Sequence, residues 1–163
     1  MNDKDLTKLS NILAKEMTNV MGINVSGSYL KEAKQILING NDTNKVKRLS
    51  LKLNFFLPES KSDSQTGYPL DRFIIRITDI EVVPERQHYG TRIIKSLLRI
   101  APEVIKIDRV ILFASGEEVK GFWERMNFRN HPTRPLSMHT DIQNNLSIKI
   151  KRFANKVFNK GKP

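Results

Sequence analysis

The sequence of 163 residues predicts an α/β domain with a mixed, mostly antiparallel sheet flanked by helices. Three patterns lead to this fold class. Two segments near the start carry apolar residues at helical spacing, residues 46–57 alternate apolar and polar side chains, and residues 77–101 run from an apolar strand through a short turn into an amphipathic helix. The expected element order is α-α-β-β-α-β-α-β, in one domain over 1–150 followed by a basic tail over 151–163.

Two helices are expected before the first long strand. Residues 3–20 place their apolar side chains on one helical face, and two aspartates lie near the N-terminal end, where the helix dipole favours negative charge. After a break at 22–27, Ser28 is the expected cap of a second helix that ends at Asn39-Gly40. The apolar face of this second helix would hold Leu30, Ala33, Ile36 and Leu37.

Residues 46–57 and 73–83 are expected to form two antiparallel strands. The segment between them, 58–70, is rich in turn-forming and polar residues, which predicts a flexible loop with a mobile tip. The second strand changes the phase of its apolar residues at Thr78-Asp79. Such a slip indicates a β-bulge, although a strand buried on both faces near its end would show the same pattern.

The turn after Pro84 leads into a helix that carries a candidate anion site. The turn contains one glycine, Gly90, and the helix is expected to continue to Ala101. The first N–H groups of a helix are unpaired and lie at the positive end of its dipole, which is where phosphates bind. Further along, the expected elements are a central strand over 108–115, a helix over 117–126 and a last strand within 136–150.

The charge balance is strongly basic. The chain holds 28 Lys and Arg against 17 Asp and Glu, for a net charge of +11 and a pI near 10.0. This balance favours polyanionic partners such as a nucleic acid or nucleotide phosphates, although a solvated basic surface would have the same composition. No acidic residue follows Asp141, so the C-terminal segment could be an electrostatic arm that binds nucleic acid or another polyanion, or a docked amphipathic helix.

The composition also excludes some kinds of chemistry. The absence of cysteine excludes disulfides, thiolate catalysis and thiolate metal ligands. The three histidines, His88, His131 and His139, lack the spacing of ligand pairs, so we expect no metal. No apolar run approaches the roughly 20 residues of a membrane span, and residues 1–10 lack the layout of a signal peptide. We therefore expect a cytoplasmic protein with no membrane partner.

Two phrases of the sequence resemble the GNAT superfamily of acyl-CoA-dependent N-acyltransferases. The first is Val82-Val83-Pro84 followed by Gln87-His88-Tyr89-Gly90, and the second is 122–128 (FWERMNF). Together, in this order and spacing, the phrases make the region from 73 to about 130 similar to the acetyl-CoA-binding part of that family. The resemblance implies a splayed central strand, acetyl-CoA (coenzyme A) as cofactor, and transfer of its acetyl group to an amine on a small molecule, peptide, protein or aminoacyl-tRNA.

The resemblance also implies how the cofactor would be held. The strand end at Val82 and Val83 would offer backbone hydrogen bonds to the pantetheine arm, and the N–H groups of 88–92 would face the pyrophosphate. If the turn aligns with the family pattern without a gap, Arg92 stands where the family has Gly or Ala. If the turn is shortened, Gly90 is its last glycine. The residues expected to bind the cofactor are Val82, Val83, Gln87, His88, Tyr89, Gly90, Thr91, Arg92, Ser115 and Trp123.

Acyl transfer to an amine requires a base, and Glu81 and Asp79 are the best-placed carboxylates, unless both are merely exposed strand residues. Many family members have a tyrosine that protonates the departing thiolate where this chain has Trp123, which cannot supply an acidic proton. Tyr89, Ser115 or water could do so, or the thiolate could leave unaided. Trp123 would then be a core anchor. The predicted catalytic residues are Glu81, Asp79 and Tyr89.

These departures support a second hypothesis, in which a GNAT-like domain with reduced or no catalysis acts as a nucleic-acid-binding or regulatory module. Acceptor specificity is expected in the N-terminal helices, the loop 58–70 and the segment 131–140. A homodimer could form through the predicted last strand, whose apolar alternation at 146–150 suits a sheet edge.

Overall fold

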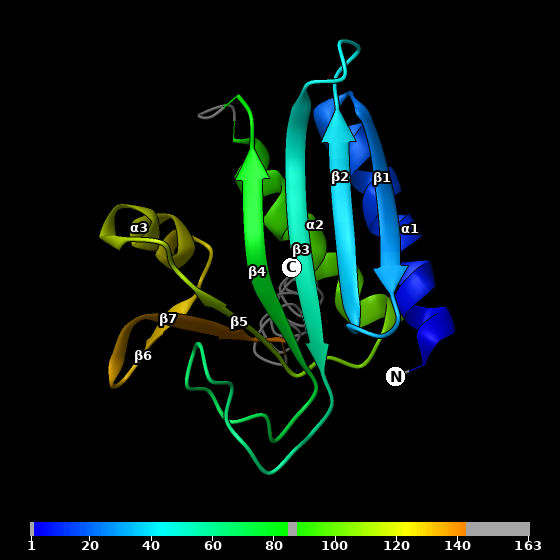
Figure 1. Ribbon diagram of the computed structural model, residues 1–163. Coiled ribbons are helices and arrows are strands. Elements are labelled where there is room, and N and C mark those ends of the chain that lie inside the picture. Colours follow the sequence, from blue (N-terminus) through cyan, green and yellow to red (C-terminus); the bar gives the residue numbers. More distant parts are fainter. Residues whose placement is uncertain (1, 85–87, 143–163) are drawn as a thin grey trace, which may run out of the picture.

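The computed structural model describes residues 2–84 and 88–142. These residues form a seven-stranded sheet with the strand order β1-β2-β3-β4-β5-β7-β6 (Figure 1). Five of its strand pairs are antiparallel and β4 pairs with β5 in parallel, which confirms the mixed, mostly antiparallel sheet. The elements are α1 (Asp3–Met21), β1 (Asn24–Leu30), β2 (Gln35–Asn41), β3 (Lys47–Phe56), β4 (Ile74–Val82), α2 (Tyr89–Val104), β5 (Arg109–Phe113), α3 (Glu117–Arg125), β6 (Arg129–His131) and β7 (Arg134–Asp141).

The first helix was predicted correctly. Asn2 caps α1 by accepting a hydrogen bond from the N–H of Asp5 at 2.8 Å, and Gly22 ends it in the left-handed conformation, with φ of 68°. Helices α1 and α2 lie side by side behind β1–β4 (Figure 1). Their apolar faces and the inner face of these strands form the main core.

The predicted second helix is wrong, because residues 24–41 form the β1–β2 hairpin. Ile36 and Ile38 alternate with Leu37 and face the core, so the spacing of two residues prevails over the helical one. Gly27 allows α1 to lie close to β1, since an added Cβ would come within 2.5 Å of the Ser10 carbonyl oxygen. The structure therefore has one helix before the sheet, and a tight turn joins its first two strands.

The strand predicted over 46–57 is confirmed as β3, with its leucines buried and Ser50, Lys52 and Asn54 on the other face. The loop 58–70 is not a mobile tip, because several of its side chains are buried and hydrogen-bonded. Tyr68 and Leu70 join a second apolar cluster on the face opposite α1 and α2. The loop is thus a packed part of the fold.

The β-bulge predicted at Thr78-Asp79 is present. In the β3–β4 ladder, Lys52 pairs with Asp79 and the next residue, Leu53, pairs with Ile77, which leaves Thr78 as the extra residue. The parallel ladder between β4 and β5 ends at the pair Ile77 and Leu112. Beyond that pair the two strands diverge (Figure 1), which confirms the splayed central strand.

The last strand of the sheet, β7, lies before the alternation at 146–150 that suggested it. That alternation and the basic tail over 151–163 lie outside the described residues. Among the described residues, no helix combines the length and the apolar content that crossing a membrane requires.

Candidate active site

A cavity of about 840 Å³ occupies the gap between the diverging ends of β4 and β5. The first turn of α2 and the side chains of α3 close its other sides. The site residues predicted from the sequence that line it are Asp79, Val82, His88, Tyr89, Gly90, Thr91, Ser115 and Trp123. The cavity thus brings together residues from four successive elements, and the outermost of these predicted residues, Asp79 and Trp123, are 44 positions apart in the sequence.

The N-terminus of α2 opens into this cavity. His88 precedes the helix with φ of 58°, and the first hydrogen bond of the helix runs from the N–H of Arg92 to the carbonyl of His88 at 3.1 Å. The N–H groups of Tyr89, Gly90 and Thr91 therefore have no partner within the helix, and they lie at the positive end of its dipole. These three residues line the cavity, where their N–H groups are the expected partners of an anion. Gln87 lies outside the described residues.

Two predicted cofactor residues do not line the cavity. Arg92 is exposed on α2. Val83 donates its N–H to the carbonyl of Arg48 at 2.9 Å, so this donor is already used on the β3 side. Because successive N–H groups of a strand point to opposite sides, the backbone of Val82 faces the cavity instead.

Apolar side chains form the walls of the cavity, chiefly from β4, the end of β5 and α3. Trp123 is 6% exposed and packs edge-on against Phe122 and Phe128, with ring centroids 4.9 and 5.2 Å apart. Its expected role as a core anchor is confirmed, and its ring also reaches the cavity. Phe113, which the sequence did not single out, lines the cavity and is 44% exposed.

Of the two predicted bases, the structure brings only Asp79 to the cavity. Its Oδ2 accepts a hydrogen bond from the hydroxyl of Ser50 at 3.2 Å. Glu81 instead forms an exposed ion pair with Lys47 at 2.9 Å. Thr78 also lines the cavity, and the phase slip in the sequence was the one signal that could have identified it.

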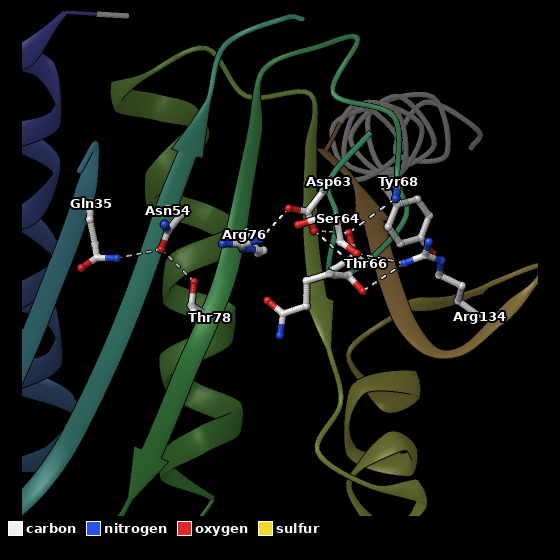
Figure 2. A network of polar contacts seen from close by, with 10 residues as sticks. Gln35, Asn54, Asp63, Ser64, Thr66, Tyr68, Arg76, Thr78 and Arg134 are labelled. Carbon is white, nitrogen blue, oxygen red and sulfur yellow. Dashed lines mark hydrogen bonds and ion pairs between the residues drawn. The ribbon is translucent and has the colours of Figure 1, made fainter. Parts of the chain in front are cut away.

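A network of polar contacts fixes the loop 58–70 next to β7 (Figure 2). Buried Asp63 accepts hydrogen bonds from the N–H and hydroxyl of Thr66 at 2.8 and 2.7 Å and pairs with Arg76 of β4. Arg134 donates to the carbonyl oxygens of Ser64 and Gln65. The two segments expected to determine acceptor specificity, 58–70 and 131–140, are therefore neighbours, whereas α1 covers the opposite face of the sheet.

The loop also contacts β7 through a buried titratable cluster. The Tyr68 hydroxyl lies 2.8 Å from Nδ1 of His139, and burial raises the pKa of Tyr68 to about 12. Burial, followed by the charge of Arg109, lowers the pKa of His139. Burial alone would raise the pKa of Asp141, but the hydrogen bond from Arg109 at 2.6 Å and its charge outweigh this and hold that pKa below its usual range.

Solved structures share this fold. AtaT complexed with acetyl-methionyl-tRNAfMet matches with a TM-score of 0.53 and 9% identity, over 74% of this chain and 76% of that one. The complex AtaTR bound with AcCoA matches with a TM-score of 0.51 and 11% identity, over 68% and 70%. A point mutant of KacT matches with a TM-score of 0.51 and 12% identity, over 70% and 74%.

The fold is that of the GNAT acyltransferases, as the resemblance at Val82-Pro84 and 122–128 implied. At identities of 9 to 12%, the likeness to KacT and AtaT concerns the fold alone. No family model matches the sequence, and no curated protein matches it.

Proposed function

We propose that this protein is an acetyl-CoA-dependent N-acetyltransferase whose acceptor is an amine. One observation carries the proposal. A single cavity joins an anion seat at the start of α2, apolar walls from β4, β5 and α3, and a polar bulge that presents Asp79. These three parts suit the phosphates, the pantetheine arm and the reacting end of an acyl-CoA.

The residues present fit acetyl-CoA. The N–H groups of Tyr89, Gly90 and Thr91 would hold the pyrophosphate. The backbone of Val82, which faces the cavity, would bind the pantetheine amides. Phe113 and Phe122 would exclude water from the thioester. Acetyl-CoA supplies an acetyl group that is already activated as a thioester.

The chain's own groups would manage the protons. Asp79 is the carboxylate at the cavity and would accept a proton from the amine, directly or through a water. Tyr89 and Ser115 both carry a hydroxyl on the cavity wall, and either would protonate the departing thiolate, because Trp123 has no acidic proton to give.

Among amine acceptors, we propose aminoacyl-tRNA as the first class to examine. The net charge of +11 suits a polyanionic acceptor, and a structure with this fold holds acetyl-methionyl-tRNAfMet. The same experiment also examines peptides, proteins and small amines as acceptors. Transfer of labelled acetyl groups from acetyl-CoA to a pool of charged tRNAs, to basic peptides and to polyamines would identify the class.

Calorimetry with acetyl-CoA tests the cofactor separately from the acceptor. A Cβ on Gly90 would lie an ordinary 3.7 Å from the ring of Phe122, so Gly90→Ala should retain affinity. Gly90→Leu should fill the space between α2 and α3 and weaken binding roughly tenfold or more, which corresponds to about 1.4 kcal/mol of binding free energy. Absence of binding by the wild type at millimolar acetyl-CoA would refute the proposal, and equal affinities of both variants would refute the seat at α2.

A further inference from the structure

The β4 bulge presents two hydrogen-bond acceptors to the cavity side by side. Thr78 and Asp79 are consecutive, both are exposed, and both line the cavity, because the bulge inserts Thr78 into the strand. A regular strand would turn one of two consecutive side chains to the opposite face of the sheet. The pair is therefore a product of the bulge.

A row of side chains across three strands sets the direction of the Thr78 hydroxyl (Figure 2). Its Oγ1 donates to Oδ1 of Asn54 on β3 at 2.8 Å. The same Oδ1 accepts from Nε2 of Gln35 on β2 at 2.9 Å. Gln35 is buried, at 8% exposure, so its amide holds the oxygen of Asn54 toward Thr78.

A hydroxyl has one proton and two lone pairs. Because the proton of Thr78 is used on Asn54, its oxygen can only accept a hydrogen bond from the cavity. The neighbouring carboxylate of Asp79 also only accepts, and Ser50 occupies one side of it. The bulge therefore offers two acceptors and no side-chain donor to whatever binds there.

We propose that Thr78 and Asp79 form the seat of the acceptor amine, and that Asn54 and Gln35 are positioning residues that keep Thr78 an acceptor. An ammonium, which donates several N–H hydrogen bonds, satisfies this pair, whereas a thioester carbonyl, itself an acceptor, does not. The inference rests on the proposed function in that the seated amine is the one to be acetylated. The seat selects a primary amine with its N–H groups toward β4.

The test uses NMR of the full-length, isotope-labelled protein without acetyl-CoA, titrated with methylammonium chloride. Tetramethylammonium chloride is the matched control, because it has the same charge and no N–H donor. Methylammonium should give saturable shifts at the amides of Thr78 and Asp79, and tetramethylammonium should bind roughly tenfold more weakly, the difference that a charge-assisted hydrogen bond makes. No saturable shift, or equal binding of the two cations, overturns the proposal.

Variants examine each acceptor and its support. Thr78→Val keeps the shape and should remove most of the preference for methylammonium, whereas Thr78→Ser should retain it. Asn54→Ala should act like Thr78→Val, while Asn54→Asp preserves the acceptor and the preference. An unchanged preference in Thr78→Val or in Asn54→Ala overturns the assignment, provided that thermal unfolding shows the variant folded. A protein that selects methylammonium yet does not bind acetyl-CoA would refute the proposed function and leave this seat in place.

Discussion

Asp79 and Glu81 lie on the same face of β4, two residues apart, and their neighbours give them different roles. Lys47 pairs with Glu81 outside the cavity, whereas Asp79 lies at the bulge beside Thr78. Sequence reasoning could name both carboxylates but could not separate them, since the separation depends on the contact that each carboxylate makes with a residue of β3. Asn54 and Gln35 carried no signal at all, because their contact exists only once three strands are in register.

Replacing Asp79 by Asn should lower kcat by roughly 100-fold or more, the usual contribution of a positioned base. The affinity for acetyl-CoA should stay within about twofold, a change well below 1.4 kcal/mol, because the proposed role of Asp79 is toward the amine and not toward the cofactor. Steady-state kinetics with the best acceptor, together with calorimetry, measure both. Glu81→Gln is the matched control and should keep nearly wild-type kcat. A larger loss in Glu81→Gln than in Asp79→Asn would reverse the assignment.

At the scale of elements, the structure explains which patterns were informative. The alternation of β3 and the phase slip of β4 are direct consequences of a period of two, and both predicted the structure correctly. Residues 28–39 carry apolar residues that fit helical spacing, yet Ile36 and Ile38 also fit a strand, and pairing with β3 decided between them. The loop 58–70 was predicted to be mobile from its composition. The prediction is wrong because polar residues of the loop hydrogen-bond to one another, which composition does not reveal.

The aromatic anchor of α3 should contribute substantially to stability. Trp123→Ala should lower the free energy of unfolding by ~3–5 kcal/mol, the usual cost of deleting a buried aromatic side chain. Phe113→Ala is the control, since this ring is 44% exposed and its removal should cost about 0.5 kcal/mol or less. Urea unfolding followed by circular dichroism gives both values. Equal costs would show that Trp123 does not anchor α3.

The contact between the loop 58–70 and β7 should make stability depend on pH. The pKa of His139 is lowered by burial, so the unfolded chain binds a proton more readily than the folded one once the pH falls below about 6.5. The unfolding temperature should therefore fall as pH decreases from 6.5. The depressed pKa of Asp141 adds a further decrease only below 3.8.

His139→Asn should flatten this dependence below about pH 6.5, because it removes the group that binds a proton more readily in the unfolded chain than in the folded one. The groups that act on His139 are Tyr68 from the loop, Arg109 from β5, Asp141 from β7 and Arg129 from β6. Thermal unfolding across the pH range measures the slope. His88→Asn is the control, since exposed His88 has φ of 58°, which Asn tolerates. A steep slope that persists in His139→Asn would place the titrating group elsewhere.

At the scale of the whole molecule, the excess of positive charge concerns partners and not the fold. Residues 151–163 contain five cations and no acidic residue, so deleting them lowers the net charge from +11 to +6. If this tail binds nucleic acid, its deletion should weaken tRNA binding and reduce the salt dependence by roughly 0.9 in logarithmic slope for each phosphate that the tail neutralises. Filter binding at several salt concentrations measures this. The affinity for acetyl-CoA should not change. An unaltered salt slope would show that the tail does not contact the tRNA phosphates.

The short parallel ladder between β4 and β5 has a mechanical consequence. The ladder between β4 and β5 consists of four residue pairs, from Ile74 with Arg109 to Ile77 with Leu112. It joins strands β1–β4 to strands β5–β7. A rotation about this short ladder would therefore change the width of the cavity, with a larger displacement at its open end. The loop 58–70 forms an ion pair with Arg76 of β4 and a hydrogen bond with His139 of β7, so it links the two parts of the sheet on either side of this ladder.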